Sequence, residues 1–361
     1  MNIWIDVCHT PQYNFYRKLI IDLASRGHEV YVTVLKRGRT PKIVEREIGD
    51  MPHIHVYAIG RHRMSKWSAI VEANGLRIFQ LLWWALGKHI DIVFSNCFPA
   101  MAIGWLLRRP RYAFDDDPQV WDFRPKQWTA IESDYCLYEA PADMRTAKNV
   151  KVLPVLKEWA YLAPKYFHAD VEALKEYGVK PKQYIFLREV TVGTFNYAEQ
   201  QAGAVKGIYH NIEQMRNEAR QHGIDMQVLF SLEEKHRRNE YPDDWTLLQE
   251  PIRDIHSLIY YAVGLISSGD SMAREAALLG VPSYYLGVRY DMPANQAASK
   301  VAQLQNQQTM PVTQWLTQLA KPADALEQQQ ETLRDSIDHA FIDINAYMMS
   351  LVEKHDKKRN Q

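Results

Sequence analysis

The residues of this sequence with the clearest chemical potential lie where a strand gives way to a helix. Residues 265–282 read LISSGDSMAREAALLGVP, which predicts an apolar strand, a turn at Gly269, a helix and a Gly-Val-Pro stop. A helix N-terminus presents unpaired N–H groups and the positive end of the helix dipole, so it favours phosphate oxygens. Glu275, one turn into the helix, could accept hydrogen bonds from a ribose diol. We therefore predict a nucleotide-binding site at Gly269, Asp270, Ser271, Met272 and Glu275.

That segment also has a plainer interpretation. It could be an ordinary strand-to-helix turn in which Asp270 caps the helix and Glu275 lies on the surface. Arg188 likewise has a functional and a structural interpretation. It ends a predicted strand at 184–187, where it could bind a diphosphate with both terminal nitrogens or form a structural ion pair.

Groups that could take a proton from a hydroxyl group follow two strands near the N-terminus. Asp6 and His9 end the predicted strand 3–7, and Asp115-Asp116-Asp117 follow a strand at 111–114. General-base catalysis needs a histidine or carboxylate within hydrogen-bond reach of the reacting hydroxyl. We predict Asp6, His9, Asp115 and Asp116 as the catalytic candidates. The alternatives are a turn histidine, a satisfied buried carboxylate, and a solvated acidic turn that caps the next helix.

Two series of alternating strands and helices position these residues. The strand 3–7, a helix beginning at Pro11 and a strand at 30–35 predict a right-handed βαβ unit, and the alternation continues to residue 153. Pro154, Pro164, Gly178 and Pro181 punctuate the irregular stretch 155–180, and a second series begins with the strand 184–187. This pattern predicts two doubly wound, Rossmann-like α/β domains with the active site in the cleft between them. The first domain is expected over residues 1–158 and would hold the acceptor, the molecule that carries the reacting hydroxyl. The second is expected over 159–340 and would hold the nucleotide. Residues 341–361 are expected to contain the end of one long helix, predicted over 324–354, that crosses back towards the first domain.

Composition excludes several classes of protein. The 361 residues include 43 Lys+Arg and 43 Asp+Glu, and this zero net charge argues against nucleic acid as a partner. Three widely spaced cysteines fit neither a zinc site nor a disulfide framework, so we expect reduced thiols in a cytoplasmic chain. The N-terminus lacks the basic region of a signal peptide, and no uncharged stretch reaches the roughly 18 apolar residues of a spanning helix.

Basic residues beside aromatic ones suggest a membrane side. Residues 61–67 read RHRMSKW, and residues 105–111 read WLLRRPR. Such patches suit anionic headgroups or a lipid diphosphate, so Arg61, Arg63 and Lys66 are predicted on the acceptor or membrane side of a peripheral protein. The alternative is core tryptophans flanked by solvated charges.

Residues 265–282 resemble the nucleotide-sugar signature of the GT-B glycosyltransferase superfamily. That superfamily includes the enzyme that adds N-acetylglucosamine in lipid II synthesis and the non-hydrolysing UDP-N-acetylglucosamine 2-epimerases. The chain as a whole resembles a prokaryotic domain family of unknown function whose members are predicted glycosyltransferases. The matching blocks are Trp4-Ile5-Asp6, Pro11, Arg26-Gly27-His28-Glu29-Val30, Lys157-Glu158-Trp159-Ala160-Tyr161-Leu162 and Arg188. The chain departs from the family at Gly269-Asp270-Ser271, where Gly-Gly-Thr is usual, and at Gln12, where histidine is usual.

The resemblance implies a GT-B-like fold and transfer of a sugar from a nucleoside diphosphate, foremost a UDP-sugar. The acceptor would be a glycan or a lipid-linked molecule in surface polysaccharide biosynthesis. No obligatory metal and no cofactor are implied, because the nucleotide sugar is a co-substrate. Two alternatives stay open: a nucleotide-sugar 2-epimerase, and a nucleotide-sugar-binding protein without catalysis. The epimerases carry a His-Arg pair where this chain has Leu187-Arg188, and a His-x-Glu-Ala-Gly stretch near the place of Phe114-Asp115-Asp116-Asp117, which favours the transferase.

Overall fold

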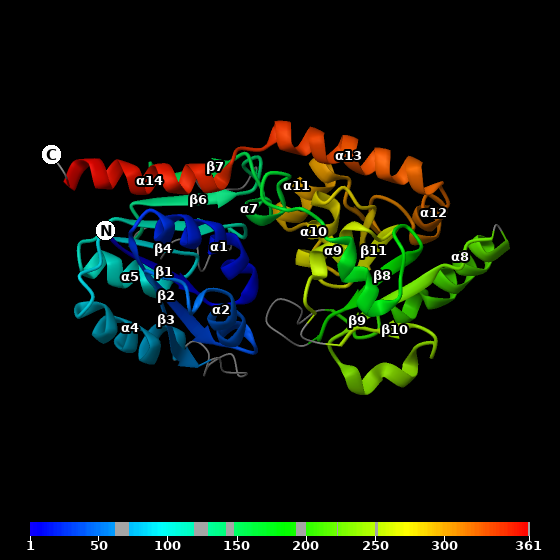
Figure 1. The fold of residues 1–361 in the computed structure, drawn as a ribbon, viewed down its shortest axis with the longest axis horizontal. Helices are drawn as coiled ribbons and strands as arrows, with labels where there is room; N and C mark the ends of the chain where they lie inside the picture. Colours follow the sequence, from blue (N-terminus) through cyan, green and yellow to red (C-terminus); the bar gives the residue numbers. More distant parts are fainter. Residues whose placement is uncertain are drawn as a thin grey trace. The chain divides into compact units, whose positions relative to one another are not determined.

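The chain forms two compact units. The computed structural model describes residues 1–61, 72–118, 129–141, 148–192, 200–221, 223–249 and 252–359. Unit 1 comprises Met1–Tyr161 and Phe341–Gln361, and unit 2 comprises Leu162–Ala340. Each unit is built on one sheet flanked by helices (Figure 1). No helix within the described ranges is long and apolar enough to cross a membrane.

Unit 1 contains a seven-stranded parallel sheet in the order β3-β2-β1-β4-β5-β6-β7. Strands β2 and β3 are added on one side of β1, and strands β4 to β7 are added on its other side. The strands are β1 (Asn2–Val7), β2 (Glu29–Lys36), β3 (Ile54–Arg61), β4 (Ile92–Ser95), β5 (Arg111–Asp115), β6 (Glu132–Cys136) and β7 (Val150–Leu153). The helices are α1 (Thr10–Ser25), α2 (Thr40–Ile48), α4 (Arg77–Leu86), α5 (Phe98–Leu106), α7 (Trp159–Leu162) and α14 (Ile344–Arg359), with a π turn η1 (Glu72–Leu76) before α4.

Neighbouring residues of a strand point to opposite faces of the sheet, so both faces carry apolar side chains. Helices cover both faces of this sheet. Phe114 of β5 contacts Phe15 of α1 and Tyr347 of α14 on one face. Its neighbour Ala113, together with Val93 of β4, packs with apolar side chains of α4 and α5 on the other face. Alternation of this kind buries both faces, as expected for a parallel sheet.

Unit 2 repeats the same topology with six parallel strands in the order β10-β9-β8-β11-β12-β13. The strands are β8 (Tyr184–Glu189), β9 (Gln227–Leu232), β10 (Thr246–Leu247), β11 (Gly264–Ser267), β12 (Ser283–Tyr285) and β13 (Gln305–Asn306). The helices are α8 (Tyr209–Gln221), α9 (Ile255–Tyr260), α10 (Asp270–Leu278), α11 (Pro293–Ala302), α12 (Val312–Thr317) and α13 (Ala323–Ala340), with short 3₁₀ turns η2 (Val171–Tyr177), η4 (Lys206–Ile208) and η5 (Lys235–Glu240). Two doubly wound α/β domains, as predicted from the alternation, are therefore confirmed.

The C-terminal segment differs from the single long helix that the sequence predicts. Helix α13 ends at Ala340, and α14 begins at Ile344. Between them, the Asp343 carboxylate accepts a hydrogen bond from the Ala346 N–H and so starts a new helix. Phe341 leaves the helical path to pack against Tyr138 and Trp159 of unit 1.

Other elements differ at their ends or were missed. The apolar and aromatic residues 135–138 predict a strand that reaches Tyr138, but β6 ends at Cys136, and Tyr138 has a positive φ of 64° that extended backbone does not adopt. The sequence also predicts a helix from about Ala198 to His222, whereas α8 begins at Tyr209, after the 3₁₀ turn η4. A further predicted helix spans 67–86, and its first residues fall in 62–71, outside the described residues. Helices α2, α11 and α12 have no counterpart in the sequence-based assignment.

Candidate active site

Each sheet places polar residues where its strand order reverses. In unit 1 this point lies between β1 and β4, and in unit 2 between β8 and β11. Ligands of doubly wound sheets bind beyond the carboxyl ends of the strands at this point. In unit 2 the reversal sets Arg188 of β8 beside Ser267 of β11, directly before the predicted nucleotide-binding turn.

The turn between β11 and α10 is held rigidly by its own serines. The Ser267 hydroxyl accepts a hydrogen bond from the Gly269 N–H (3.0 Å) and donates one to the Gly269 carbonyl oxygen (2.7 Å). The Ser268 hydroxyl accepts a bond from the Val190 N–H at the end of β8 (3.0 Å). Gly269 has extended backbone and caps the N-terminus of α10. The first-turn N–H groups of α10 thus face the carboxyl edge of the sheet, as an anion site requires.

The charge of Asp270 is neutralised by two arginines. Its carboxylate oxygen Oδ2 lies 3.0 Å from Nη1 of Arg289 and 3.6 Å from Nη1 of Arg274, and its Oδ1 accepts the Ser271 N–H. Arg274 also donates to Oδ1 of Asn295 at 2.7 Å. An aspartate at this position therefore brings two cations to the helix N-terminus, and it does not leave a lone negative charge beside a phosphate.

Glu275 faces α9 rather than open solvent. It is 7% exposed, and its Oε1 lies 3.5 Å from Nε2 of His256 in the first turn of α9. Burial lowers the pKa of His256, but the adjacent Glu275 carboxylate outweighs burial and holds the pKa above its ordinary value. The surface-glutamate alternative is thus wrong: Glu275 is buried and lies one turn into α10.

Arg188 forms the structural ion pair that the sequence left as one of two choices. Its Nη1 donates to the Ser231 hydroxyl at 2.5 Å, and its Nη2 pairs with Glu233 beyond the end of β9. The same Glu233 accepts the Thr191 N–H at 2.7 Å through its other oxygen. Arg188 would have to leave Glu233 to bind a diphosphate, so we interpret it as a residue that shapes this edge.

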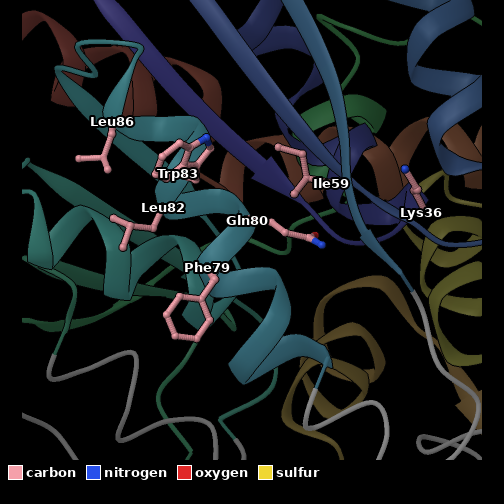
Figure 2. Close-up of a pocket in the computed structure, with 7 residues that line it drawn as sticks. All are labelled: Lys36, Ile59, Phe79, Gln80, Leu82, Trp83 and Leu86. Carbon is pink, nitrogen blue, oxygen red and sulfur yellow. The ribbon is translucent and has the colours of Figure 1, made fainter.

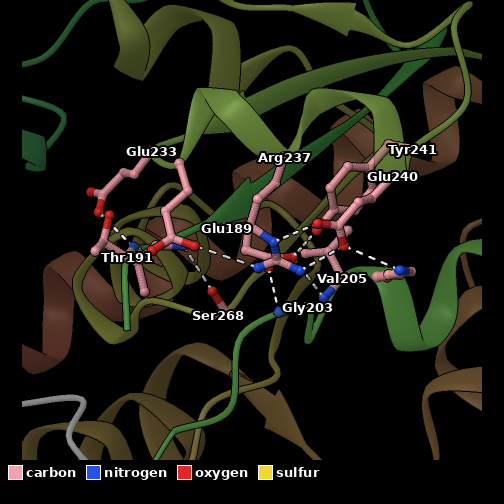
Figure 3. A network of polar contacts seen from close by, with 12 residues as sticks. Glu189, Thr191, Gly203, Val205, Glu233, Arg237, Glu240, Tyr241 and Ser268 are labelled. Atoms are coloured by element: carbon pink, nitrogen blue, oxygen red, sulfur yellow. Dashed lines mark hydrogen bonds and ion pairs between the residues drawn. The ribbon is translucent and has the colours of Figure 1, made fainter. Parts of the chain in front are cut away.

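Glu189, the next residue, organises the loops around that edge (Figure 3). It is buried, and its carboxylate accepts bonds from the N–H groups of Gly203 (2.6 Å) and Val205 (3.1 Å) and from the Tyr241 hydroxyl (2.7 Å). Arg237 adds an ion pair at 3.2 Å. All these bonds are internal, so we interpret Glu189 as an architectural residue.

In unit 1 the Asp6 carboxylate is fully engaged. Oδ1 and Oδ2 lie 2.5 Å and 3.1 Å from the two terminal nitrogens of Arg77 in α4, and both side chains are 1% exposed or less. The Thr33 hydroxyl donates to Oδ1 at 2.6 Å and accepts from Nε1 of Trp4 at 2.7 Å. Both carboxylate oxygens are bound to buried partners, so the geometry favours the orienting role for Asp6 over that of base.

His9 and Asn96 carry buried polar atoms at the carboxyl ends of β1 and β4. Within the described residues, Nδ1 of His9 and both amide atoms of Asn96 lack a hydrogen-bond partner. Buried polar groups are nearly always hydrogen-bonded, so these atoms are suited to bind the hydroxyl groups of a ligand. Burial lowers the pKa of His9 to about 3, assisted by Lys157 and Arg37 and opposed by Asp116. The imidazole is therefore neutral at neutral pH.

The three acids after β5 are arranged around Lys157. The Lys157 Nζ lies 2.7 Å from Oδ1 of Asp116, and both side chains are largely buried. Burial lowers the pKa of Lys157, but Asp116 outweighs this effect and raises it. Asp115 accepts the N–H groups of Asp116 (2.8 Å) and Asp117 (3.4 Å) and so closes the turn. Asp116 and Lys157 shift the pKa of His9 in opposite directions. Asp115 instead fixes the backbone of the turn that it forms with Asp116 and Asp117.

This architecture is similar to that of several proteins of known structure. No protein-family model matches the sequence, and no curated protein matches it. Solved structures match over nearly the whole chain. The UDP-GlcNAc 2-epimerase of Neisseria meningitidis bound to UDP-GlcNAc has a TM-score of 0.65 and 12% identity, covering 99% of this chain and 100% of its own. The glycotransferase of kitacinnamycin has a TM-score of 0.66 and 12% identity over 98% of both chains. Acinetobacter baumannii MurG has a TM-score of 0.56 and 14% identity over 98% of this chain and 99% of its own.

The protein has the GT-B fold. At 11–14% identity these likenesses establish the fold and leave the activity open. The resemblance to the prokaryotic family of predicted glycosyltransferases stays a prediction. GT-B enzymes and epimerases both appear among the similar structures, so the choice between them depends on the residues of this chain.

Within this GT-B chain, one group of the described residues could in principle hold a metal ion: Asp6, Cys8 and Cys97, whose ligand atoms lie within 4.8 Å of one another. Both oxygens of Asp6 are already bound to Arg77. The carboxylate is thus not available as a ligand, and we assign no metal here.

Close to β3, which ends at the predicted acceptor- or membrane-side residue Arg61, helix α4 exposes large apolar side chains. Arg61 ends β3 and is exposed, whereas Arg63 and Lys66 lie outside the described residues. Beside Arg61's strand, an open hollow is lined by Lys36, Ile59, Phe79, Gln80, Leu82, Trp83 and Leu86 (Figure 2). Phe79 and Trp83 of α4 are 71% and 83% exposed, so Trp83 is not a core tryptophan. Its neighbour Trp84, by contrast, packs against Trp4.

Five residues near the carboxyl edges of the two sheets have no predicted role from the sequence: Arg77, Asn96, Lys157, Arg289 and Asn295. Asn96 directly follows a buried strand, and the rule that selected His9 would have found it. Arg77 is the single charge in an apolar helix and signalled a buried partner. Lys157 belonged to a matching block without an assigned role. Arg289 and Asn295 carry no sequence signal, because they reach α10 from loops and helices beyond β12.

Proposed function

We propose that this GT-B protein is a glycosyltransferase that takes a sugar from a nucleoside diphosphate, foremost uridine diphosphate, and passes it to a hydroxyl group of a glycan or lipid-linked acceptor. The observation that carries the proposal is the N-terminus of α10. There a strand-order reversal, a rigid Gly-containing turn and two arginines come together. Surface polysaccharide biosynthesis is the process we expect it to serve.

Unit 2 supplies the donor chemistry in this proposal. The first-turn N–H groups of α10 and the cations Arg274 and Arg289 favour the diphosphate, because both kinds of group attract negative charge. Glu275 lies on the same helix one turn farther along, as a buried acceptor for two vicinal hydroxyl groups. The same charges assist departure of the nucleoside diphosphate when its bond to the sugar breaks.

Unit 1 supplies the base. The neutral imidazole of His9 takes the proton of the acceptor hydroxyl as that oxygen attacks the anomeric carbon. The imidazolium that results is favoured by Asp116, and Asn96 offers an amide to hold acceptor hydroxyl groups. Asp6 and Arg77 keep the end of β1 in place.

Two buried positions favour the transferase over the epimerase. Leu187 stands where the resemblance places the epimerase histidine of the His-Arg pair, Phe114 lies near the place of the His-x-Glu-Ala-Gly stretch, and both are fully buried apolar side chains. Incubation with a UDP-sugar and no acceptor separates the two activities. We expect no epimer, and epimer formation without acceptor would overturn the transferase proposal.

A thermal-shift series tests the donor site. We expect uridine diphosphate and its sugars to raise the melting temperature, because a ligand that binds the native state stabilises it by about 2.7 kcal/mol at 100 times its Kd. Glu275→Ala should remove most of that shift at the same ligand concentration, since the ribose loses its acceptor.

The control for this series is Glu331→Ala, which removes an exposed glutamate of the same unit on α13. It should keep the full shift. His256→Ala is a second control, which removes the ion-pair partner of Glu275 but leaves the Glu275 carboxylate in place. The thermal shift should be kept in this variant as well. A wild-type protein with a flat response to every uridine ligand would contradict the donor assignment.

The apolar face of α4 and α5 extends the proposal to an anionic membrane surface, where a lipid-linked acceptor would lie. Phe79, Trp83 and Trp105 are exposed on this face, and the sequences of both helices contain no acidic residue. Arg108 and Arg109 follow α5 and are exposed. Aromatic side chains beside cations suit the headgroup region of such a membrane.

A further inference from the structure

Two cysteines that the proposed reaction does not use meet at the carboxyl edge of the unit 1 sheet. The Sγ atoms of Cys8 and Cys97 lie 2.8 Å apart, close to the roughly 2.05 Å of a disulfide bond, although the residues are 89 positions apart in sequence. Both are free thiols and half-buried, so a small oxidant can reach them. The third cysteine, Cys136, is fully buried.

The surroundings make one of these thiols reactive. Cys97 caps the N-terminus of α5, and Cys8 directly precedes the residue that caps α1. Arg77 places Nη1 3.6 Å from the Cys8 Sγ. A hydrogen bond from the Cys97 thiol lowers the pKa of Cys8, aided by Arg77, while the same contact and burial raise the pKa of Cys97. Cationic neighbours and helix N-termini are features of reactive cysteines.

Gln12 holds the pair together. Its Oε1 accepts the Cys8 N–H at 2.7 Å, and its Nε2 lies 3.6 Å from the Cys97 Sγ. The side chain of Gln12 is buried on α1, so it links the loop after β1 to the loop after β4. The two sulfur atoms are therefore brought together by fixed backbone and a shared amide.

We propose that Cys8 and Cys97 form a dithiol that hydrogen peroxide converts into an intramolecular disulfide. The Cys8 thiolate attacks one peroxide oxygen, and the O–O bond breaks to give a sulfenic acid and hydroxide, which becomes water. The Cys97 thiol then attacks the Cys8 sulfur, the S–S bond forms, and the sulfenic hydroxyl leaves as a second water with the thiol proton. Two thiols are oxidised, and one peroxide is reduced to two waters.

The crosslink would join the two loops that carry the candidate acceptor residues. His9 follows Cys8 directly, and Asn96 directly precedes Cys97. Oxidation thus fixes the end of β1 to the end of β4 at the edge where His9 and Asn96 lie. The link to acceptor binding rests on the proposed function, whereas formation of the disulfide does not.

The test uses the full-length protein, reduced and then treated with hydrogen peroxide. We expect the intact mass to fall by two hydrogen atoms, a peptide joining Cys8 to Cys97, and a fall in reactive thiols of the denatured protein from three to one. Reductant should reverse all three changes. A linkage that includes Cys136, a crosslink between two molecules, or unchanged thiols would each overturn the proposal.

Matched variants assign the two roles. Cys136→Ser should form the same disulfide as the wild type. Cys97→Ser should leave a sulfenic acid on Cys8 that dimedone labels, while Cys8→Ser should give neither disulfide nor label on Cys97. Label on Cys97 in Cys8→Ser at the level seen for Cys8 would contradict the assignment of Cys8 as the reacting thiol.

Discussion

The protonation state of His9 depends on its burial and on the charges around it, and not on a sequence motif. Burial, Lys157 and Arg37 hold its pKa near 3, and Asp116 acts in the opposite direction. An imidazole with this pKa is unprotonated over the whole neutral range and is a weak base at equilibrium. Among the groups around it, Asp116 favours the imidazolium.

The pH profile of transfer follows from this pKa. Between about pH 5 and pH 8 we expect no acid limb from His9, because its protonated form appears only near pH 3. Lys157→Met removes a cation and frees the charge of Asp116; both changes raise the pKa of His9, so an acid limb should move up into the measured range. The profile of kcat/KM checks this.

His9→Gln provides the control. It should lower transfer by about 10²–10⁴-fold, the usual contribution of a general base, while keeping the uridine diphosphate thermal shift. A wild-type acid limb near pH 6.5 that His9→Gln abolishes would contradict the depressed pKa.

At the scale of elements, the two sides of α4 differ in burial. One side buries Leu81, Ala85 and the Arg77–Asp6 pair, while the other exposes Phe79 and Trp83. Single exposed apolar residues are ordinary, but a run of large ones on one helix indicates a contact surface. The absence of acids on α4 and α5 fits an anionic partner.

Vesicle binding measures that surface. Phe79→Ser with Trp83→Ser should weaken binding to phosphatidylglycerol vesicles at least tenfold. Arg108→Gln with Arg109→Gln should weaken it by about 30-fold, since each cation near an anionic surface contributes about 1 kcal/mol. Val288→Ser, which removes an exposed apolar side chain of unit 2, is the control and should bind as the wild type does. Equal binding to phosphatidylcholine would exclude the anionic-surface proposal.

At the scale of the whole molecule, unit 1 is completed by the far end of the chain. Helix α14 buries Ile344, Met348 and Val352 against it, and Arg26 of unit 1 pairs with Glu353 at 2.6 Å. The Tyr347 hydroxyl donates to Glu132 of β6 at 2.6 Å. α14 is thus part of the unit 1 core.

Met348→Ala should therefore destabilise unit 1 by about 2–5 kcal/mol, because the side chain is fully buried. Urea unfolding followed by tryptophan fluorescence measures the loss. Lys354→Ala, on the exposed side of the same helix, should change stability by no more than about 0.5 kcal/mol. The uridine diphosphate thermal shift should survive in Met348→Ala, and its loss would show that unit 2 depends on this helix as well.

Local sequence patterns were sufficient for the two alternating series and for the turn at Gly269, since strand, turn and helix there lie within 20 residues. The edges of the site depend on contacts between distant segments, which no local pattern contains. Arg289 reaches Asp270 from 19 positions away, and Arg77 reaches Asp6 from 71. The break after Ala340 escaped prediction for the same reason, because Phe341 leaves the helix to meet Trp159.

The division of unit 1 into two segments also has a consequence for synthesis on the ribosome. Residues 162–340 form an uninterrupted unit and emerge before α14 does. Domains generally fold as units as they leave the ribosome, so unit 2 can reach its final state while unit 1 still lacks its last helix. During that interval Tyr112 and Phe114 lack the contacts that His355 and Tyr347 of α14 make with them. The first-made half of this protein is therefore the last to be finished.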